Sequence, residues 1–81
     1  MAEARKIRVM IVDDHDIVRS GLSVLLDTFD DLELVGESSS GEDALNLCQA
    51  LHPDVVLMDL MMPGMAGVEA IRAIHRALPE I

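Results

Sequence analysis

Several residue types that would indicate particular structures are scarce in this 81-residue sequence. Cys48 is the single cysteine, which excludes a disulfide framework and a paired-cysteine metal site. Only six Lys and Arg stand against fifteen Asp and Glu, and a net charge of −9 argues against non-specific nucleic-acid binding through phosphate contacts. No apolar run approaches the roughly 20 residues of a membrane span, and Met1–Arg5 does not lead into a signal-peptide core. We therefore expect a cytoplasmic domain with no membrane contact and no nucleic-acid contact through this segment.

What the sequence does contain is enough apolar surface for a small core. Hydrophobic residues make up 51% of the chain, which excludes a disordered acidic tail. A length of 81 residues allows one small domain at most. Cys48 shares a helical spacing with Ala44 and Leu51, so we interpret it as a buried hydrophobic residue and not as a reactive thiol.

Short apolar runs alternate with amphipathic segments along the chain. The pattern predicts strands at 7–13, 32–37 and 54–60, and helices at 16–29, 42–52 and 67–78. Helical connections of this length between strands favour right-handed crossovers and a parallel sheet. Three strands with three helices scarcely supply the cover that a parallel sheet needs on both faces. We therefore expect residues 1–81 to be part of a larger α/β domain.

Helical periodicity also predicts which side chains share an apolar face. Asp16 is expected as the N-cap or a first-turn acid of the first helix, and Ser40 as the N-cap of the second. Met10 and Met58 are expected in strand core, and Met61, Met62 and Met65 in a partly exposed loop. The shared faces consist of Val18, Leu22, Leu25, Leu26 and Phe29; of Ala44, Leu45, Cys48 and Leu51; and of Val68, Ile71, Ile74 or His75, and Leu78.

Aspartates follow two of the predicted strands where each strand ends. Asp13 and Asp14 come directly after the first apolar run, and Asp59 comes directly after Val55–Met58. If these strands are neighbours, the three carboxylates lie within one or two strand spacings of about 4.8 Å. At ~5 Å and an effective dielectric constant of ~20, each pair of negative charges repels by about 3 kcal/mol. We expect a fold to retain such a cluster only where a cation or a reaction requires it.

Magnesium fits this set of oxygens. It prefers octahedral oxygen ligation with one or two carboxylates and several waters. The predicted ligands are Asp13, Asp14 and Asp59, with the backbone carbonyl of Met61 as a further oxygen where the chain turns. With the cation present, Asp59 is a plausible nucleophile toward phosphorus, because phosphoryl transfer depends mostly on positioning and charge neutralisation. We interpret His15 as a residue of the strand-to-helix turn and not as a catalytic group.

The same residues carry a family resemblance. Val12-Asp13-Asp14-His15 with Val18-Arg19-Ser20-Gly21-Leu22, and Leu57-Met58-Asp59 with its Pro-Gly loop, strongly resemble receiver domains of bacterial two-component response regulators. The opening motif and the Val35-Gly36-Glu37-Ser38 segment with Ser40-Gly41-Glu42-Asp43-Ala44-Leu45 look most like the NarL/LuxR-type branch. The resemblance covers essentially all of the chain.

The resemblance implies a fold, a function and partners. The fold is flavodoxin-like, a doubly wound parallel sheet of which this chain contains the first three βα units in strand order 2-1-3. Asp59 is implied as the acceptor of a phosphoryl group from a sensor histidine kinase, Asp14 as a direct Mg²⁺ ligand, and Asp13 as a ligand partly through water. The branch implies a transcription regulator with a DNA-binding output domain downstream. A domain of this kind takes part in its own phosphoryl transfer and is not a turnover enzyme.

One departure from the family pattern concerns residues that bind the phosphoryl oxygens. Receiver domains use a Ser or Thr after the fourth strand and a Lys after the fifth, whereas the only lysine here, Lys6, precedes the first strand. We therefore expect the 81-residue chain to be impaired in phosphorylation and switching. We also expect the edge of the third strand and the apolar faces of the first and third helices to lack cover. A homodimer or a domain-swapped oligomer through that edge is a further expectation.

Three other classes of function remain as alternatives. A hydrolase that forms an aspartyl-phosphate would need a second acid two residues after the nucleophile, where this chain has Met61. A nucleotide-binding domain would need a glycine-rich loop after the first strand, where this chain has His15-Asp16. A receiver-like interaction scaffold that works without phosphorylation is the third, and the intact acid cluster disfavours it.

Overall fold

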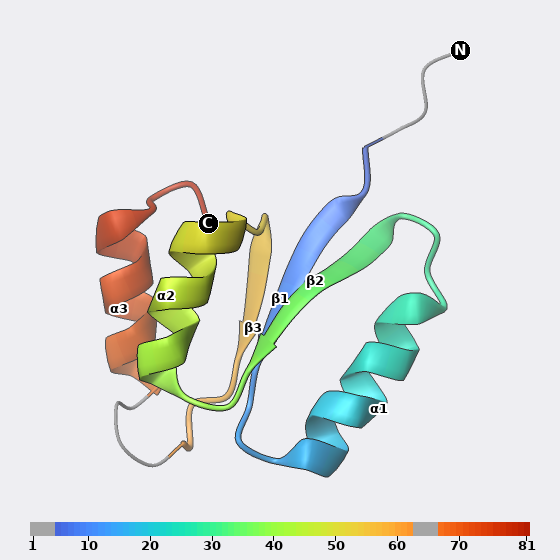
Figure 1. Cartoon of the computed structure of the whole chain (residues 1–81), viewed down its shortest axis with the longest axis horizontal. Coiled ribbons are helices and arrows are strands. Elements are labelled where there is room, and N and C mark those ends of the chain that lie inside the picture. The colour runs from blue at the N-terminus through green and yellow to red at the C-terminus, as the bar shows by residue number, and fades with distance from the viewer. Residues whose placement is uncertain (1–4, 63–66) are drawn as a thin grey trace.

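The computed structural model describes residues 5–62 and 67–81 and contains six elements that alternate between strand and helix (Figure 1). Each end lies within two residues of the prediction from sequence. Among the described residues, no helix combines the length and apolarity needed to cross a bilayer. The elements are β1 (Ile7–Val12), α1 (Asp16–Asp27), β2 (Leu32–Ser38), α2 (Gly41–Leu51), β3 (Val55–Met58) and α3 (Gly67–Ala77).

The three strands form one parallel sheet in the order β2-β1-β3, which confirms the expected flavodoxin-like arrangement. β1 is the central strand, and its residue Val12 pairs with Ser38 of β2 on one side and with Met58 of β3 on the other. The strands therefore end level with one another. The segments that follow β1 and β3 leave the sheet at the same edge, and this places the residues of the candidate site.

The core has two parts, one on each face of the sheet. Met10 and Val12 point to the face covered by α2 and α3, where they pack with Ala44, Cys48 and Ile74. Alternate residues of β1 point to the face covered by α1, where Val9 and Ile11 pack against Leu26. Because both faces of β1 are covered, its last four residues are all buried. The Asp13-Asp14 pair thus directly follows a strand that is covered on both faces.

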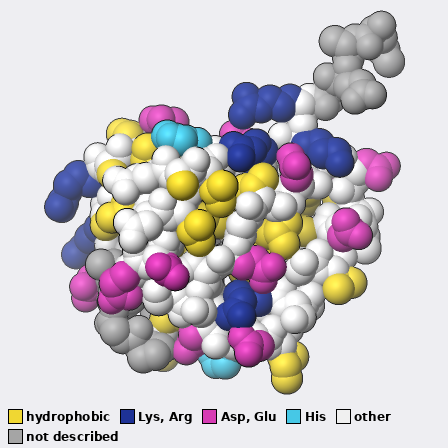
Figure 2. All heavy atoms as spheres, in the orientation of Figure 1, with side chains coloured by type: hydrophobic (Ala, Val, Ile, Leu, Met, Phe, Trp, Pro, Cys, Tyr) yellow, Lys and Arg dark blue, Asp and Glu magenta, His cyan; other side chains and the backbone are white. Residues whose placement is uncertain are grey.

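Some apolar surface stays uncovered, as expected from the sequence. α1 lies alone on its face of the sheet in Figure 1, and its Val18 and Leu25 are exposed although Leu26 is buried. Phe29, which follows the helix, is exposed as well. On α3, Ile74 is the buried residue of the Ile74–His75 pair, and Ile71 is exposed. Figure 2 shows hydrophobic side chains reaching the surface between acidic side chains that are dispersed over the face.

One local prediction needs correction and two are confirmed. Met62 is buried in the core beside α3, not partly exposed, because it packs with the α2–α3 cluster; Met65 lies outside the described residues. Asp16 is a first-turn acid, the second of its two predicted roles, since the residue at the N-cap is His15. Ser40 is the N-cap of α2, and its hydroxyl accepts a hydrogen bond from the Asp43 backbone N–H at 3.1 Å.

Cys48 is buried as expected. It makes no contact with solvent, and burial raises the pKa of its thiol above the usual range. A thiol in that state carries little thiolate, so the inert interpretation from sequence agrees with the structure.

α3 begins in close contact with the end of β3. A Cβ atom at Gly67 would lie 2.6 Å from the Cα of Leu60 and would overlap the backbone carbonyl of Asp59. The first residue of α3 must therefore be glycine if the helix is to start this close to the residue that ends the strand. Gly21, in the middle of α1, is the opposite case, because a Cβ there meets nothing within 4 Å.

We expect two alanine substitutions to have opposite effects on stability. Gly67→Ala should destabilise the chain by about 1–3 kcal/mol, because the methyl group displaces α3 from the β3 end. Gly21→Ala should stabilise it by about 0.5–1 kcal/mol, since it removes backbone entropy from the unfolded chain within a helix. Urea unfolding followed by circular dichroism measures both; equal effects of the same sign would contradict the packing at Gly67.

The outer edge of β3 has no strand partner among residues 5–62 and 67–81. Val55 and Leu57 are 41% and 38% exposed on this strand. An unpaired, apolar edge strand of this kind is a site for association between chains. The dimer or domain-swapped oligomer through this edge, expected from the sequence, stays a prediction.

We expect the chain to associate at micromolar concentration and Val55→Lys to reduce that association, because a lysine on an edge strand opposes strand addition. Val24→Lys on α1 is the matched control, since Val24 is 68% exposed and lies away from this edge. Light scattering at a series of concentrations measures the effect. A compact monomer for the unsubstituted chain, or equal effects of the two lysines, would contradict it.

Candidate functional site

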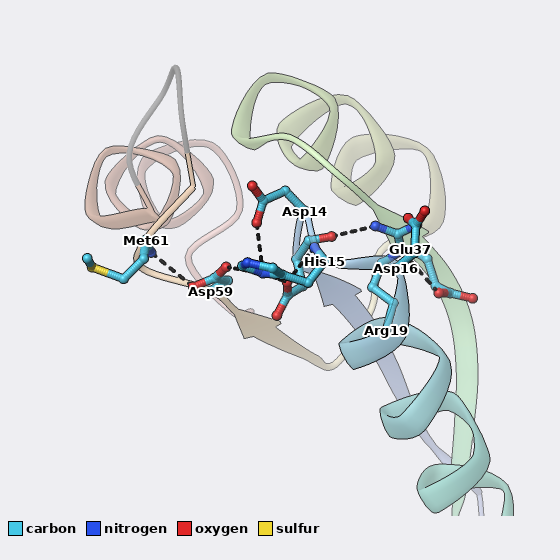
Figure 3. Close-up of polar contacts among 8 residues, drawn as sticks. Asp14, His15, Asp16, Arg19, Glu37, Asp59 and Met61 are labelled. Carbon is cyan, nitrogen blue, oxygen red and sulfur yellow. Dashed lines mark hydrogen bonds and ion pairs between the residues drawn. The ribbon is translucent and has the colours of Figure 1, made fainter.

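The candidate site lies where β1 and β3 end. The backbone pairing continues one residue past each strand: the Asp13 N–H donates to the Ser38 carbonyl at 3.0 Å, and the Asp59 N–H donates to the Val12 carbonyl at 2.8 Å. These bonds hold the acids that follow both strands at one edge of the sheet. Each of Asp13, Asp14, His15 and Asp59 offers one ligand atom, and these atoms all lie within 4.8 Å of one another (Figure 3). The three aspartates predicted from sequence are therefore brought together.

Asp13 is buried and is held by its neighbour two residues along the chain. Its Oδ1 accepts the His15 backbone N–H at 2.8 Å and lies 2.9 Å from the His15 ring nitrogen Nδ1. The backbone hydrogen bond is the main reason that the pKa of Asp13 lies below its usual range, although burial acts in the opposite direction. Asp13 is therefore an anion in the folded chain at neutral pH.

Asp14 carries an oxygen that the protein leaves without a hydrogen bond. Its Oδ1 is shielded from solvent and has no hydrogen-bond partner among the described residues, while the His15 Nδ1 lies 3.1 Å away. A buried carboxylate oxygen without a hydrogen bond costs roughly 1–3 kcal/mol, and among the described residues the only cationic group close to it is the His15 ring. A hard cation such as Mg²⁺ would satisfy this oxygen. The donor set of carboxylate oxygens therefore fits the cation that the sequence predicts.

Asp59 is oriented by the turn that follows it. One carboxylate oxygen, Oδ1, accepts the Met61 backbone N–H at 2.9 Å, which fixes the rotation of the carboxylate. The other oxygen, Oδ2, lies 3.7 Å from the His15 Nδ1, on the side of the cluster. The Met61 side chain is 84% exposed and points away from the acids in Figure 3. The role predicted for the Met61 carbonyl remains a prediction.

His15 contributes more than the turn role assigned from sequence. Its Nδ1 lies within 4 Å of an oxygen of all three aspartates, and its side chain is 62% exposed. The hydrogen bond to the Asp13 side chain is the main cause that raises the pKa of His15, and the charge of Asp14 adds to it. The sequence showed that His15 follows the acid pair but not that its ring turns back over the acids.

Arg19 is the second contributor that sequence reasoning left without a role. Its Nη1 donates to the Asp13 backbone carbonyl at 2.7 Å, and its side chain also pairs with Asp16 and with Glu37 of β2. The guanidinium thereby ties α1 and β2 to the segment that carries the acids, and Figure 3 shows it between Asp16 and Glu37. The sequence signal for this role of Arg19 was its position in the Val18–Leu22 motif that follows Asp13-Asp14.

Comparison with known proteins gives one consistent result. The response regulator receiver domain family matches residues 9–81. The chain is 51% identical over 75 residues to the response regulator GacA of Pseudomonas viridiflava, an alignment that covers 93% of this chain and 35% of the relative. The chain thus spans about a third of the length of the curated relatives it matches.

Solved structures agree in fold. The signal receiver domain of the putative response regulator NarL from Mycobacterium tuberculosis superposes with a TM-score of 0.86 at 38% identity, covering 91% of this chain and 60% of that one. RcsB from Salmonella enterica serovar Typhimurium, solved bound to promoter rprA in the presence of the phosphomimetic BeF3⁻, superposes with a TM-score of 0.85 at 32% identity, covering 93% and 63%. These structures extend the sequence match to the three-dimensional arrangement of the strands and helices.

The acids at the ends of β1 and β3, the parallel order β2-β1-β3 and the matches over nearly the whole chain support the same assignment. The chain belongs to the response regulator receiver domain family and is similar to its NarL/LuxR-type members.

Proposed function

We propose that Asp59 accepts a phosphoryl group from a sensor histidine kinase, with Mg²⁺ held by Asp13, Asp14, Asp59 and the Met61 carbonyl. The observation that carries this proposal is the convergence of three carboxylates at the ends of β1 and β3, where the shielded Oδ1 of Asp14 has no hydrogen bond among the described residues. The bound cation would neutralise negative charge on the phosphoryl oxygens as they approach the acids.

The residues around Asp59 have separate tasks in this proposal. The Met61 N–H holds one Asp59 oxygen, so the carboxylate has a fixed direction before the donor arrives. An Asp59 oxygen attacks phosphorus and forms the O–P bond while the bond from phosphorus to the donor breaks, and the electron pair leaves with the donor. The His15 N–H keeps Asp13 ionised and oriented toward the cation site.

The partners and the setting are also part of the proposal. The donor is a sensor histidine kinase in the cytoplasm, and the response is carried by a DNA-binding output domain outside residues 1–81. The RcsB structure supports this proposal, because that relative was solved bound to promoter DNA in the presence of the phosphomimetic BeF3⁻. The domain acts as a signalling acceptor and not as a turnover enzyme.

An interaction scaffold that works without phosphorylation is the competing proposal. The exposed apolar residues of α1 would suit a binding surface, whereas a scaffold has no use for three carboxylates held close together at one edge of the sheet. Addition of Mg²⁺ and then beryllofluoride separates the two proposals. A receiver forms a Mg²⁺-dependent beryllofluoride complex at Asp59, and a scaffold does not.

We expect Asp14→Asn to have opposite effects without and with magnesium. Without Mg²⁺ the variant should be more stable by about 1 kcal/mol, because the loss of a like charge and of a shielded carboxylate oxygen that has no hydrogen bond outweighs the loss of the contact with His15. With saturating Mg²⁺ the unsubstituted chain should gain stability through binding to the folded state, whereas the variant should gain little. Thermal unfolding with and without Mg²⁺ measures both effects.

Asp30→Asn is the matched control for that comparison, since it makes the same charge change at an exposed residue outside the acid cluster. It should leave the response to Mg²⁺ intact. An equal response to Mg²⁺ in the Asp14 and Asp30 variants would refute the metal site.

We expect a small phosphodonor to modify Asp59 alone. Modification should need Mg²⁺ and should be absent in Asp59→Asn, because the Met61 N–H fixes the direction of the Asp59 carboxylate beside the proposed cation site. The yield on the 81-residue chain should be low, since the phosphate-binding Ser or Thr and Lys of the family pattern are not in this sequence. Intact-mass measurement and peptide mapping give the site; modification that persists in Asp59→Asn would contradict the assignment, and a high yield would contradict the expected impairment.

A further inference from the structure

Arg19 is a charged residue whose position the stability of its helix does not explain. It is the fourth residue of α1, near the end of the helix where a positive charge opposes the helix dipole. Its side chain is only 19% exposed, and its ion pairs are with the exposed Asp16 and, at 3.6 Å, with Glu37. Ion pairs with exposed partners contribute little to stability. The contact that remains to be explained is the bond from Nη1 to the Asp13 backbone carbonyl at 2.7 Å.

This carbonyl belongs to the peptide unit that joins Asp13 to Asp14. A peptide unit is planar, so a donor that fixes its carbonyl limits the backbone rotations of the residues on both sides. One bond from Arg19 therefore acts on the directions of two acidic side chains. Figure 3 shows the guanidinium reaching from α1 toward the segment that contains Asp14 and His15.

Asp14 depends on this peptide unit more than Asp13 does. The Asp13 backbone N–H pairs with Ser38, and its carboxylate has a donor of its own, the His15 backbone N–H at 2.8 Å. Among the described residues, by contrast, no group donates a hydrogen bond to Asp14 Oδ1. The direction of the Asp14 carboxylate thus follows from the backbone before it, which is the backbone that Arg19 holds.

We propose that Arg19 is a positioning residue of the cation site and that it raises the affinity for Mg²⁺ by holding the Asp13–Asp14 peptide unit. The inference rests on the proposed function, because it concerns the same site, and Arg19 itself does not contact the cation. The charge of the guanidinium acts in the opposite sense, since a positive charge next to Asp13 repels an incoming cation. Positioning and charge therefore predict changes of opposite sign when Arg19 is replaced.

Arginine suits this role better than lysine does. The guanidinium is planar and presents separate nitrogens to the Asp13 carbonyl, to Asp16 and to Glu37. A lysine ammonium is a single point of charge on a flexible stem. Lysine at this position would keep the charge but could not hold the carbonyl in the same fixed frame.

The test compares four variants. Arg19→Met keeps the aliphatic stem and removes the charge and the donors, whereas Arg19→Lys keeps the charge. Arg72→Met makes the same charge change on α3, outside the acid cluster. Leu26→Val loosens the packing of α1 against β1 and leaves Arg19 unchanged. Circular dichroism first confirms that each variant is folded, and Arg19→Lys serves for the comparison if Arg19→Met does not fold.

Two measurements are made on each chain. Calorimetric titration with Mg²⁺ gives the dissociation constant. Hydrogen exchange of the His15 amide, measured without metal, reports on the turn after Asp13, because this amide donates to the Asp13 carboxylate. The Asp43 amide, which donates to Ser40 at the start of α2, is the reference.

We expect the Mg²⁺ dissociation constant to rise about tenfold in Arg19→Met, as for other residues that orient ligands, and by less in Arg19→Lys. It should change little in Arg72→Met and Leu26→Val. Without metal, the His15 amide should exchange faster in Arg19→Met than in the unsubstituted chain, while exchange of the Asp43 amide stays the same.

An unchanged or lower dissociation constant in Arg19→Met would overturn the positioning role, since loss of charge alone gives that sign. An equal rise in Leu26→Val would overturn it too, because general loosening of α1 would then suffice. Absence of Mg²⁺ binding by the unsubstituted chain would overturn the proposed function itself. The His15 amide decides the role of Arg19 in that case as well: faster exchange in Arg19→Met supports it, and unchanged exchange overturns it.

Discussion

The crowding of three carboxylates at one edge of the sheet is the constraint on which the rest of this structure depends. Asp13 and Asp14 follow the central strand, Asp59 follows its neighbour, and the backbone pairing that continues past β1 and β3 gives these acids little freedom to separate. At an effective dielectric constant of ~20, each close pair of these charges opposes folding by about 3 kcal/mol. The apolar burial of β1 on both faces, directly before two of these acids, opposes that repulsion.

The protein offsets part of this repulsion with donors from the residues that follow each strand. The His15 N–H and ring serve Asp13, the Met61 N–H serves Asp59, and Arg19 ties the Asp13 carbonyl to α1 and β2. Among residues 5–62 and 67–81, no group donates a hydrogen bond to Asp14 Oδ1, and the His15 ring nitrogen lies 3.1 Å from it. The site is thus held in shape but incompletely neutralised, which is the electrostatic state expected of a pocket that binds a cation. Stability is reduced here for the sake of a site, a common relation between activity and stability.

The strands, the parallel order and the three aspartates could be predicted because they follow from local patterns: apolar runs, helical spacing and acids at strand ends. The burial of Met62 could not, since it depends on how the segment after β3 folds back onto α2 and α3. The contact of His15 with the acids could not be predicted either. The direction of the His15 ring depends on the conformation of the turn into α1, which the sequence pattern does not give. The close approach of Gly67 to the end of β3 likewise appears only once the helix is placed.

The central claim is that the acids at the ends of β1 and β3 form one cation site, and an amide NMR titration with Mg²⁺ tests it most directly. The His15 and Met61 amides donate to Asp13 and Asp59, so they report on the site from both strands. The account predicts that these two signals shift together and saturate as Mg²⁺ is added. The chemical shift of the Asp43 amide, which donates to the Ser40 hydroxyl at the start of α2, should not change. Small unsaturated shifts spread over the exposed acids, with no response at His15 and Met61, would contradict it.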